Sequence, residues 1–426
     1  MSVFVLDKCG KPLMPCSEKR ARLLLERRRA RVHRLVPFVI RLTDRLVANS
    51  KFQPLLLKIE PGSKVTGLAL VRKADAGIAV LSLFELLHRG RQISEALAVR
   101  KNFRRRRRSA NLRYRAPRFH NAGRRDGWLA PSLKHRVDST ISWVTRLGRW
   151  VPISRLASEL VRFDTEVIHR LEIAGTESKP GELAGHEVRE YLLEKWGHRC
   201  AYCEAQGVPF QVHRILSQAQ GGTNRVSNLT LACAPCATRF SQGVRGLITD
   251  GVRVEHLLRR AKAPYADAAA VNGTRRVLVE RLQHTGLPLD VSTGARTKWN
   301  RLRLGMPKSQ ALDAACVGPV EIISGWQRPA LQIKCMGRGS YQRTRLTAQG
   351  FPRGYLTRSK RVHGFQTGDR VLANVSAGKK AGIYVGRVAV RATGSFNIQT
   401  QQGVIQGISH RHCVILQRAD GYSYSM

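Results

Sequence analysis

Short apolar runs separated by turn residues mark the early part of the chain. The runs cover residues 55–59, 66–71 and 78–83, with a turn rich in Pro, Gly and Ser after the first and Gly77 before the third. Apolar runs of this length bounded by turn residues predict β-strands. Because the connections are short, we predict three adjacent strands that pair in sequence order.

Helical patterns alternate with these strands. Ser17 precedes a leucine-rich run and is predicted to be an N-cap, since its hydroxyl can accept a backbone N–H of the first turn. Helical periodicity predicts further helices in the ranges that follow: from residue 93 onward, 134–147, 154–162 and 310–317.

Beyond residue 327 the pattern changes to short strands with glycine turns. Such strands cover 365–372, 386–390 and 394–398, and short strands with glycine turns predict a small, separate β-barrel. The fold class is therefore α/β and multidomain.

The charge balance identifies the class of partner. The chain has 426 residues, with 74 Lys and Arg against 29 Asp and Glu, a formal net charge of +45. A fold does not require this excess, whereas a polyanionic partner does. A ribosomal protein or a membrane-surface binder is the alternative, but 42% hydrophobic residues in long patterned segments favour a large folded body that binds nucleic acid.

The N-terminus and the apolar runs indicate a location. The chain contains no run of about 20 apolar residues, and its first residues lack the order of a signal peptide. We therefore expect a cytoplasmic protein, associated with the nucleoid when bound to its target.

The cysteines favour metal binding over disulfides. Of nine cysteines, four form two CxxC pairs, Cys200 with Cys203 and Cys233 with Cys236, roughly thirty residues apart. Two such pairs supply the four thiolates of a tetrahedral zinc site, so we predict structural zinc. The other five are expected to be packing residues: Cys9, Cys16, Cys316, Cys335 and Cys413.

The stretch between the two CxxC pairs resembles the core of HNH endonucleases, which carry a metal ligand and a general-base histidine on one strand. His213 and Asn228 fit the outer positions of this motif. Arg214 occupies the position of the base, and Ala237 that of a ligand on the following helix. Because arginine does not give up its proton at physiological pH, we expect this centre not to hydrolyse DNA.

Three carboxylates far apart in sequence form a second candidate centre. We expect Glu60 at the turn after the first strand of the meander, Glu159 on a helix and Asp313 on the last helix facing the sheet. Several carboxylates are needed to hold two magnesium ions for phosphodiester hydrolysis. Scattered acids are more often surface residues, so this trio alone is a weak indication.

An arginine-rich segment is the candidate nucleic-acid-binding surface. Residues 99–123 contain no acidic residue, and arginine suits bidentate contact with phosphate. The candidate contacts are Arg104, Arg105, Arg106, Arg107, Arg108, Arg113, Arg115 and Arg118. We expect alanine at positions 104–108 to abolish RNA loading.

Together these features resemble the IscB family of transposon-encoded, RNA-guided DNA endonucleases related to CRISPR single-effector nucleases. The matching segments span almost the whole chain in order. They are 3–7 with 12–15, 61–67, the arginine helix, 127–133, Glu159 with 163–164, the HNH insertion, 311–318, 337–341, 350–355 and 364–369.

The resemblance implies a domain order and a set of partners. The implied domains are a PLMP domain (1–52), three segments of an RNase H-like RuvC domain (53–88, 127–180 and 256–326), an arginine-rich bridge helix (89–126), an inserted zinc-ribbon HNH domain of ββα type (181–255) and a C-terminal domain (327–426) that contacts guide RNA and the target-adjacent duplex. It also implies a long structured noncoding guide RNA and a double-stranded DNA target with a short adjacent motif. Use of the protein as the targeting part of a larger assembly would add a further protein partner.

The departures from the family pattern fall on catalytic positions. Glu60 replaces the family's aspartate, and Gln310 replaces a histidine one helical turn before Asp313. With Arg214 and Ala237, both nuclease centres are altered while the scaffold motifs persist.

Three functional hypotheses follow. The preferred one is a nuclease-deficient, RNA-guided DNA-binding protein with structural zinc. The alternative is an endonuclease or nickase that cuts through a residual magnesium site at Glu60, Glu159 and Asp313. A third is a general RNA-binding chaperone without guide-dependent DNA specificity.

Overall fold

The computed structural model describes residues 2–74, 77–110, 127–160, 183–241, 251–262, 266–337, 343–357, 359 and 361–425. It divides into two units. The first comprises Met1–Glu159 and Val277–Met426, and the second comprises Leu160–Arg276. Helices and strands are mixed in both, so the α/β class is confirmed.

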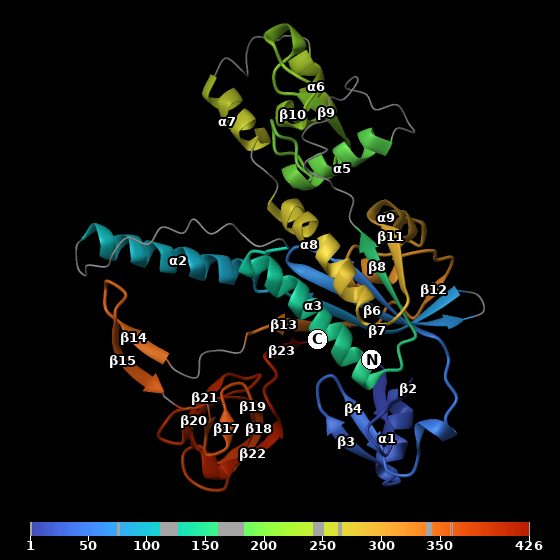
Figure 1. Cartoon of the computed structure of the whole chain (residues 1–426), viewed down its shortest axis with the longest axis vertical. Helices are drawn as coiled ribbons and strands as arrows, with labels where there is room; N and C mark the ends of the chain where they lie inside the picture. The colour runs from blue at the N-terminus through green and yellow to red at the C-terminus, as the bar shows by residue number, and fades with distance from the viewer. Residues whose placement is uncertain are drawn as a thin grey trace. The chain divides into compact units, whose positions relative to one another are not determined.

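A large mixed sheet forms the centre of the first unit (Figure 1). Its strands, in spatial order, are β11 (Leu289–Thr293), β8 (Arg155–Leu160), β5 (Leu55–Pro61), β6 (Val65–Ala74), β7 (Gly77–Leu87), β13 (Ala330–Cys335) and β23 (Tyr422–Ser425), with β12 (Ile323–Ser324) also paired to β7. Strands β5, β6 and β7 are antiparallel neighbours, which confirms the predicted meander. Strand β8 is parallel to β5, and β13 is parallel to β7.

The prediction of a helix at 154–162 is wrong. Residues Arg155–Leu160 form strand β8, in which Leu156 pairs with Leu57 and Ser158 with Ile59. From sequence alone, a short apolar run is consistent with either a buried helix or a buried strand. Here four consecutive residues of β8 are buried, as expected for a strand that is covered on both faces.

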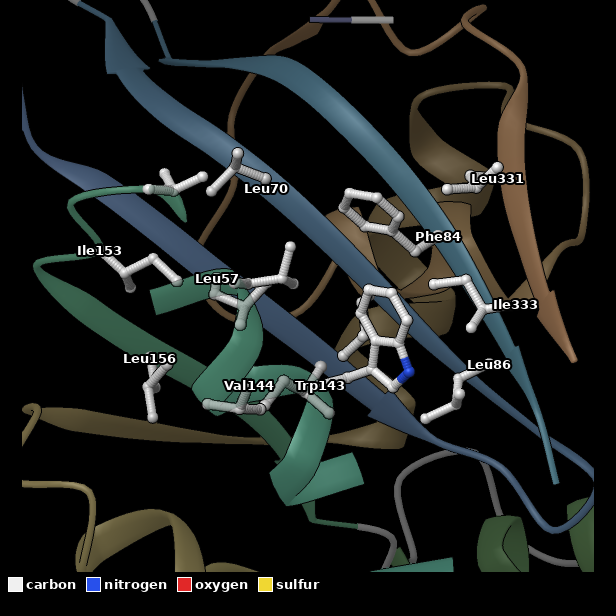
Figure 2. Close-up of a cluster of buried hydrophobic side chains, with 14 of the residues drawn as sticks. Leu57, Leu70, Phe84, Leu86, Trp143, Val144, Ile153, Leu156, Leu331 and Ile333 are labelled. Atoms are coloured by element: carbon white, nitrogen blue, oxygen red, sulfur yellow. The ribbon is translucent and has the colours of Figure 1, made fainter. Parts of the chain in front are cut away.

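One face of the sheet is covered by helix α3 (Pro131–Trp150), as Figure 2 shows for Trp143 and Val144. The buried positions of α3 recur every three or four residues, so one stripe of the helix meets the sheet. Trp143 is fully buried against Phe84, Leu86 and Ile333 within one cluster. Truncating a buried tryptophan of this kind costs about 3–5 kcal/mol.

The opposite face is covered by helix α10 (Gln310–Ala315). Strand β6 serves both faces, because Leu68 and Leu70 belong to the cluster under α3 while Ala69 and Val71 contact α10. Gly67 permits this close approach, since a Cβ there would lie 1.8 Å from the carbonyl oxygen of the first residue of α10.

A four-stranded sheet is formed by the N-terminal residues. Its elements are β1 (Val3–Leu6), β2 (Pro12–Cys16), α1 (Glu18–Glu26), β3 (Ala30–Arg34) and β4 (Val39–Leu42), with strand order β2-β1-β4-β3; a 3₁₀ turn, η1 (Val47–Asn49), follows. The Ser17 hydroxyl accepts the backbone N–H of Arg20, as predicted for an N-cap.

A five-stranded antiparallel sheet follows in the C-terminal part, in the order β21-β20-β19-β18-β22. The elements here are β14 (Arg343–Leu346), β15 (Pro352–Thr357), β16 (Arg361–Val362), β17 (Phe365–Gln366), β18 (Arg370–Val375), β19 (Gly382–Ala389), β20 (Ser395–Gln399), β21 (Val404–Ser409), η4 (His410–His412) and β22 (Cys413–Gln417). Among the described strands, β21 and β22 are the two edges and do not pair with each other. We therefore describe the element as a sheet and not as the predicted barrel. Strands β13 and β23, within the range predicted as the C-terminal domain, belong to the large sheet.

Three further described helices belong to the first unit. They are α2 (Gly90–Ser109), α9 (Gly294–Arg303) and the C-terminal part of α8 (Ala266–Gln283). Helices α2, α3 and α10 confirm the helices predicted from residue 93, over 134–147 and over 310–317.

The second unit is built on a β-hairpin with helices. Its elements are α5 (Leu183–Trp196), β9 (Phe210–Arg214), η2 (Gln218–Gln220), η3 (Val226–Asn228), β10 (Leu229–Cys233), α6 (Ala234–Ser241), α7 (Gly251–Lys262) and the start of α8. Trp196, Tyr191 and Leu231 are fully buried in its own core. No described helix in either unit meets the length and apolarity that crossing a bilayer demands.

Candidate functional site

The structure brings the three predicted carboxylates together. Glu60 lies near the end of β5 rather than on the turn, and Glu159 lies on β8 rather than on a helix. Since β8 runs parallel to β5, with Ile59 paired to Ser158, the next residues of the two strands are neighbours. Asp313 reaches the same place from α10, which packs on β5 and β6.

Burial and like charge dominate the electrostatics of this carboxylate cluster. Burial raises the pKa of Glu60 well above its ordinary value, and the charges of Glu159 and Asp313 raise it further, against the opposing effect of Arg136. Burial raises the pKa of Glu159 to about 7, with the Asp313 charge adding and a hydrogen bond from Thr297 opposing. Three neighbouring acids in one buried place favour a bound cation, which relieves their repulsion.

Asp313 already has a cationic neighbour. The Arg301 guanidinium Nε lies 2.7 Å from Asp313 Oδ1, and both side chains are largely buried. Burial nonetheless raises the pKa of Asp313, against the lowering by Arg301 and Lys308.

Sequence reasoning missed three residues of this site. Arg301 and Thr297 come from α9, one turn apart, on the face toward the cluster. Lys58 is buried on β5, and its ammonium donates to the carbonyls of Ala315 (3.1 Å) and Val317 (2.8 Å) at the end of α10. Burial lowers the pKa of Lys58 to about 8. The available signal was a lone lysine inside an otherwise apolar strand.

Gln310 lies at the first position of α10, one turn before Asp313 as predicted. Its side-chain Oε1 would lie 2.6 Å from a Cβ at Gly62, so it packs on the turn that follows β5. A glutamine amide is neither a base nor an acid near neutral pH. The position therefore supplies no proton acceptor to the carboxylate cluster.

The HNH-type hairpin of the second unit has the strands predicted for it. Arg214 and Leu229 pair at the end of β9 and β10 that the connecting loop closes. Arg214 Nε donates to Asn224 Oδ1 (2.7 Å), which holds the guanidinium on the loop. His213 Nδ1 lies 2.9 Å from the Tyr202 hydroxyl; burial lowers the pKa of His213, and the Arg214 charge lowers it too, against a backbone hydrogen bond.

Asn228 stabilises the loop of this hairpin. Its Oδ1 accepts the backbone N–H of Leu216, and its Nδ2 donates to the carbonyls of Leu216 and Thr223, all at 2.9 Å. Ala237 lies on α6 and is buried in the hydrophobic core of the unit. Neither residue presents a base or a metal-binding atom to the position beside Arg214.

The two CxxC pairs converge at one end of the hairpin. The four sulfur atoms lie within 4.8 Å of one another, and Cys203 Sγ is 3.7 Å from Cys233 Sγ. Zinc–sulfur bonds of about 2.3 Å in a tetrahedron place sulfurs roughly 3.8 Å apart, so the cluster fits zinc. Burial raises the pKa of Cys200, but backbone N–H donors from Cys233, Cys203 and Tyr202 lower it to about 7 overall.

The remaining cysteines follow the packing prediction only in part. Cys316, Cys335 and Cys413 are buried, Cys16 is half-buried, and Cys9 is exposed. The prediction for Cys9 is wrong because it lies in the tight turn between β1 and β2, where its backbone N–H binds Asp7.

A second group of potential ligands, His88, His135 and Cys335, is a hydrogen-bonded network of the core. Its donor atoms lie within 4.8 Å of one another. However, His88 Nε2 lies 2.7 Å from Thr66 Oγ1 and His88 Nδ1 lies 3.0 Å from Ser139 Oγ, so both ring nitrogens are satisfied. Burial and the charges of two neighbours lower the pKa of His88 to about 3, so the imidazole is neutral.

The arginine run lies on α2, of which no residue is buried. Two of its arginines contact the loop between β14 and β15. Arg106 donates to the carbonyl of Ala348 (3.1 Å), and Arg107 donates to that of Gly350 (3.1 Å) with its guanidinium 5.1 Å from the Phe351 ring centre. The neighbours in the run, Arg104, Arg105 and Arg108, are exposed. Arg113, Arg115 and Arg118 lie outside the described residues.

Comparison with known proteins gives two family matches. The family described as RRXRR protein matches residues 3–181, and the family described as HNH endonuclease matches residues 200–241. The second match covers both CxxC pairs and the hairpin between them, so the predicted HNH resemblance is confirmed. No curated protein matches the chain.

Among solved structures, the chain is similar to Cas9 proteins at low overall superposition. For the Type II-C Cas9 enzyme from Actinomyces naeslundii, identity is 13% and the TM-score 0.23, over 63% of this chain and 59% of that one. For Streptococcus thermophilus Cas9 with the GGAA PAM, the values are 12% and 0.24, over 62% and 32%. With the AGGA PAM they are 13% and 0.23, over 65% and 33%.

The chain thus spans about three fifths of the first of these proteins and a third of the others. The two family matches fall on the arginine-rich N-terminal part and on the cysteine-bearing hairpin. Over these two stretches the chain is similar to RRXRR proteins and to HNH endonucleases.

Proposed function

We propose that this protein is an RNA-guided double-stranded DNA-binding protein of IscB type whose HNH centre does not cleave DNA. It uses a structured noncoding guide RNA, and base pairing reads the target while the protein reads duplex shape and a short adjacent motif. The observation that carries the proposal is the position of Arg214, which occupies the place of the general base and is tied to Asn224.

The chemistry of Arg214 supports loss of cleavage. A guanidinium cannot take a proton from water at any physiological pH. Its charge also opposes a divalent cation at the same place. Loss of a general base costs about 10²–10⁴-fold in rate, and Ala237 supplies no metal ligand from α6.

Arginines of α2 support the RNA-binding part of the proposal. Arg106 and Arg107 hold the loop between β14 and β15, whereas Arg104, Arg105 and Arg108 are exposed for phosphate contact. Alanine at the three exposed positions should abolish loading of the RNA that copurifies with the protein. Alanine at Arg107 should instead disturb the loop between β14 and β15. It should leave the dependence of RNA affinity on salt concentration almost unchanged. Unchanged RNA affinity in the triple variant would refute this role.

The test of the proposal uses the ribonucleoprotein as purified. Supercoiled plasmid and short duplexes carrying a sequence complementary to the bound RNA are incubated with it in magnesium. We expect a gel shift with the matched duplex, none with a mismatched one, and no conversion of plasmid to the nicked form. Nicking that maps to one strand overturns the loss of cleavage, and equal binding of both duplexes indicates a general RNA-binding protein.

A second candidate function is a nickase that cuts through the carboxylate cluster. The specific observation in its favour is that Glu60, Glu159 and Asp313 meet although they lie far apart in sequence. The site would hold magnesium, which would polarise the scissile phosphate and activate water. If strand cleavage is seen, Asp313→Ala should abolish it, while Asp290→Ala, an exposed acid on β11 paired with Arg155, should not.

A further inference from the structure

One short stretch of apolar and aromatic residues has no role in either candidate nuclease centre. Residues 127–133 lead into α3, and Trp128 is 48% exposed there. About half of the indole surface is therefore accessible to a ligand. A cavity of about 570 Å³ opens beside it, between this segment, α3 and the C-terminal part of α8.

The wall of this cavity is apolar. Leu129 and Val137 come from the segment and from α3, and Val277 comes from α8, with Trp128 beside them. Pockets of about 300–1,000 Å³ with an apolar wall and a few polar groups are typical of small-molecule sites. The size and the flat aromatic side chain suit a planar ring system.

The polar groups of the cavity are mainly cationic or neutral. Lys134 is exposed at the cavity, and Arg281 lies 3.4 Å from Asp138. His135 also lines it; burial lowers the pKa of His135, as does the charge of Arg89, against the opposing Asp138. A neutral imidazole and a carboxylate can bond to the edge of a base, while the lysine and arginine suit a phosphate.

We propose that this cavity binds a single unstacked nucleotide of RNA, with the base stacked on Trp128 against the apolar wall and its phosphate at Lys134 and Arg281. The proposal deepens the proposed function, since the guide RNA is the natural source of such a nucleotide. A net charge of +45 disfavours a cationic or purely apolar occupant. Base–aromatic stacking is worth about 1–3 kcal/mol and tolerates any base.

The experiment uses the full-length protein and a 12-nucleotide single-stranded RNA containing 4-thiouridine. Ultraviolet crosslinking followed by mass spectrometry should find the crosslink in residues 127–138. We expect Trp128→Ala to reduce this crosslink and the affinity about tenfold, and Trp128→Phe to retain both. Trp299→Ala is the matched control, because Trp299 is 59% exposed on α9 beneath the Arg303 guanidinium and should have no effect.

Three results would overturn the proposal. They are wild-type crosslinking in Trp128→Ala, equal loss in Trp299→Ala, and equal crosslinking of DNA of the same sequence. Lys134→Ala should make the slope of log affinity against log salt concentration shallower by about 0.7, the value for one phosphate contact with a single strand. A thermal melt shows that each variant is folded. If guided DNA binding fails but the Trp128-dependent crosslink persists, the proposed function is wrong and the nucleotide site stands.

Discussion

Under the proposed function, the HNH-type hairpin and the carboxylate cluster each lack a different part of a nuclease centre. The hairpin keeps its scaffold, with four converging thiols and a loop held by Asn228, but presents Arg214 where a base is needed. The cluster keeps three acids in one place, but lacks a proton acceptor at Gln310 and has Arg301 paired with Asp313. Under that proposal, the hairpin keeps its scaffold without a base, and the cluster keeps its acids without a proton acceptor.

The two centres also differ in how much their residues destabilise the folded state. Arg214 is only partly buried and satisfied by Asn224, so it adds little strain. Glu60, Glu159 and Asp313 repel one another in a buried place, which destabilises the folded state until a proton or a cation relieves it. Bound metal would therefore stabilise the carboxylate cluster by relieving this repulsion.

The largest expected effect tests the scaffold of the hairpin. Cys200→Ser with Cys233→Ser should remove zinc and unfold the second unit, because structural zinc contributes about 10–16 kcal/mol of apparent binding free energy. Metal analysis should give one zinc per wild-type chain, and hydrogen exchange should show loss of protection in residues 183–262 only. Cys9→Ser, at an exposed thiol, is the control. A metal-free protein with a protected second unit would contradict the zinc assignment.

The next effect tests whether Arg214 is what blocks cleavage. Arg214→His with Ala237→Asn restores a base and a ligand, and in an Asp313→Ala background we expect single-strand nicking at least about 10²-fold above the parent. The readout is plasmid nicking mapped by strand. Arg214→Lys with Ala237→Asn restores the ligand without the base and should stay inactive. Equal inactivity of both would show that further positions of the hairpin have lost function.

A smaller effect tests the carboxylate cluster through pH. The folded-state pKa of Glu159 is about 7, above its ordinary 4.5, so the folded protein binds the extra proton and stability falls as pH rises from 4.5 to 7. Glu159→Gln should remove up to about 3 kcal/mol of this dependence, as measured by urea unfolding. Magnesium at pH 8 should stabilise the wild type and not the variant. Glu95→Gln, an exposed pair with Arg91, should behave as wild type.

The smallest effect tests the loop of the hairpin. Asn228→Ala removes three hydrogen bonds to the backbone and should cost about 2–3 kcal/mol of stability in the second unit. Asn224→Ala releases only Arg214 and should cost about 0.5 kcal/mol. Similar costs for both, in denaturant unfolding followed in the second unit, would mean that the loop is not anchored by Asn228.

Much of both centres could be predicted from local sequence, and the failures share a cause. The meander, the hairpin between CxxC pairs and α10 follow from periodicity and spacing that are complete within a few residues. Strand β8 was mistaken for a helix because its pairing with β5 is nearly a hundred residues distant. Arg301 and Lys58 were missed because their partners, Asp313 and the end of α10, are set by tertiary packing.

Strand β23 gives the first unit an unusual folding order. Residues 422–425 pair with β13 in the large sheet, and Asp420 joins Arg34 and Arg146 from the earliest segments. The Arg34–Asp420 contact closes only after more than 380 intervening residues have been synthesised, and the Arg146–Asp420 contact after more than 270. The second unit has its own core and can fold on the ribosome long before that point. Until β23 is synthesised, the edge of β13 that it pairs with stays unpaired. We therefore expect the first unit to fold slowly and to depend on chaperones while it folds.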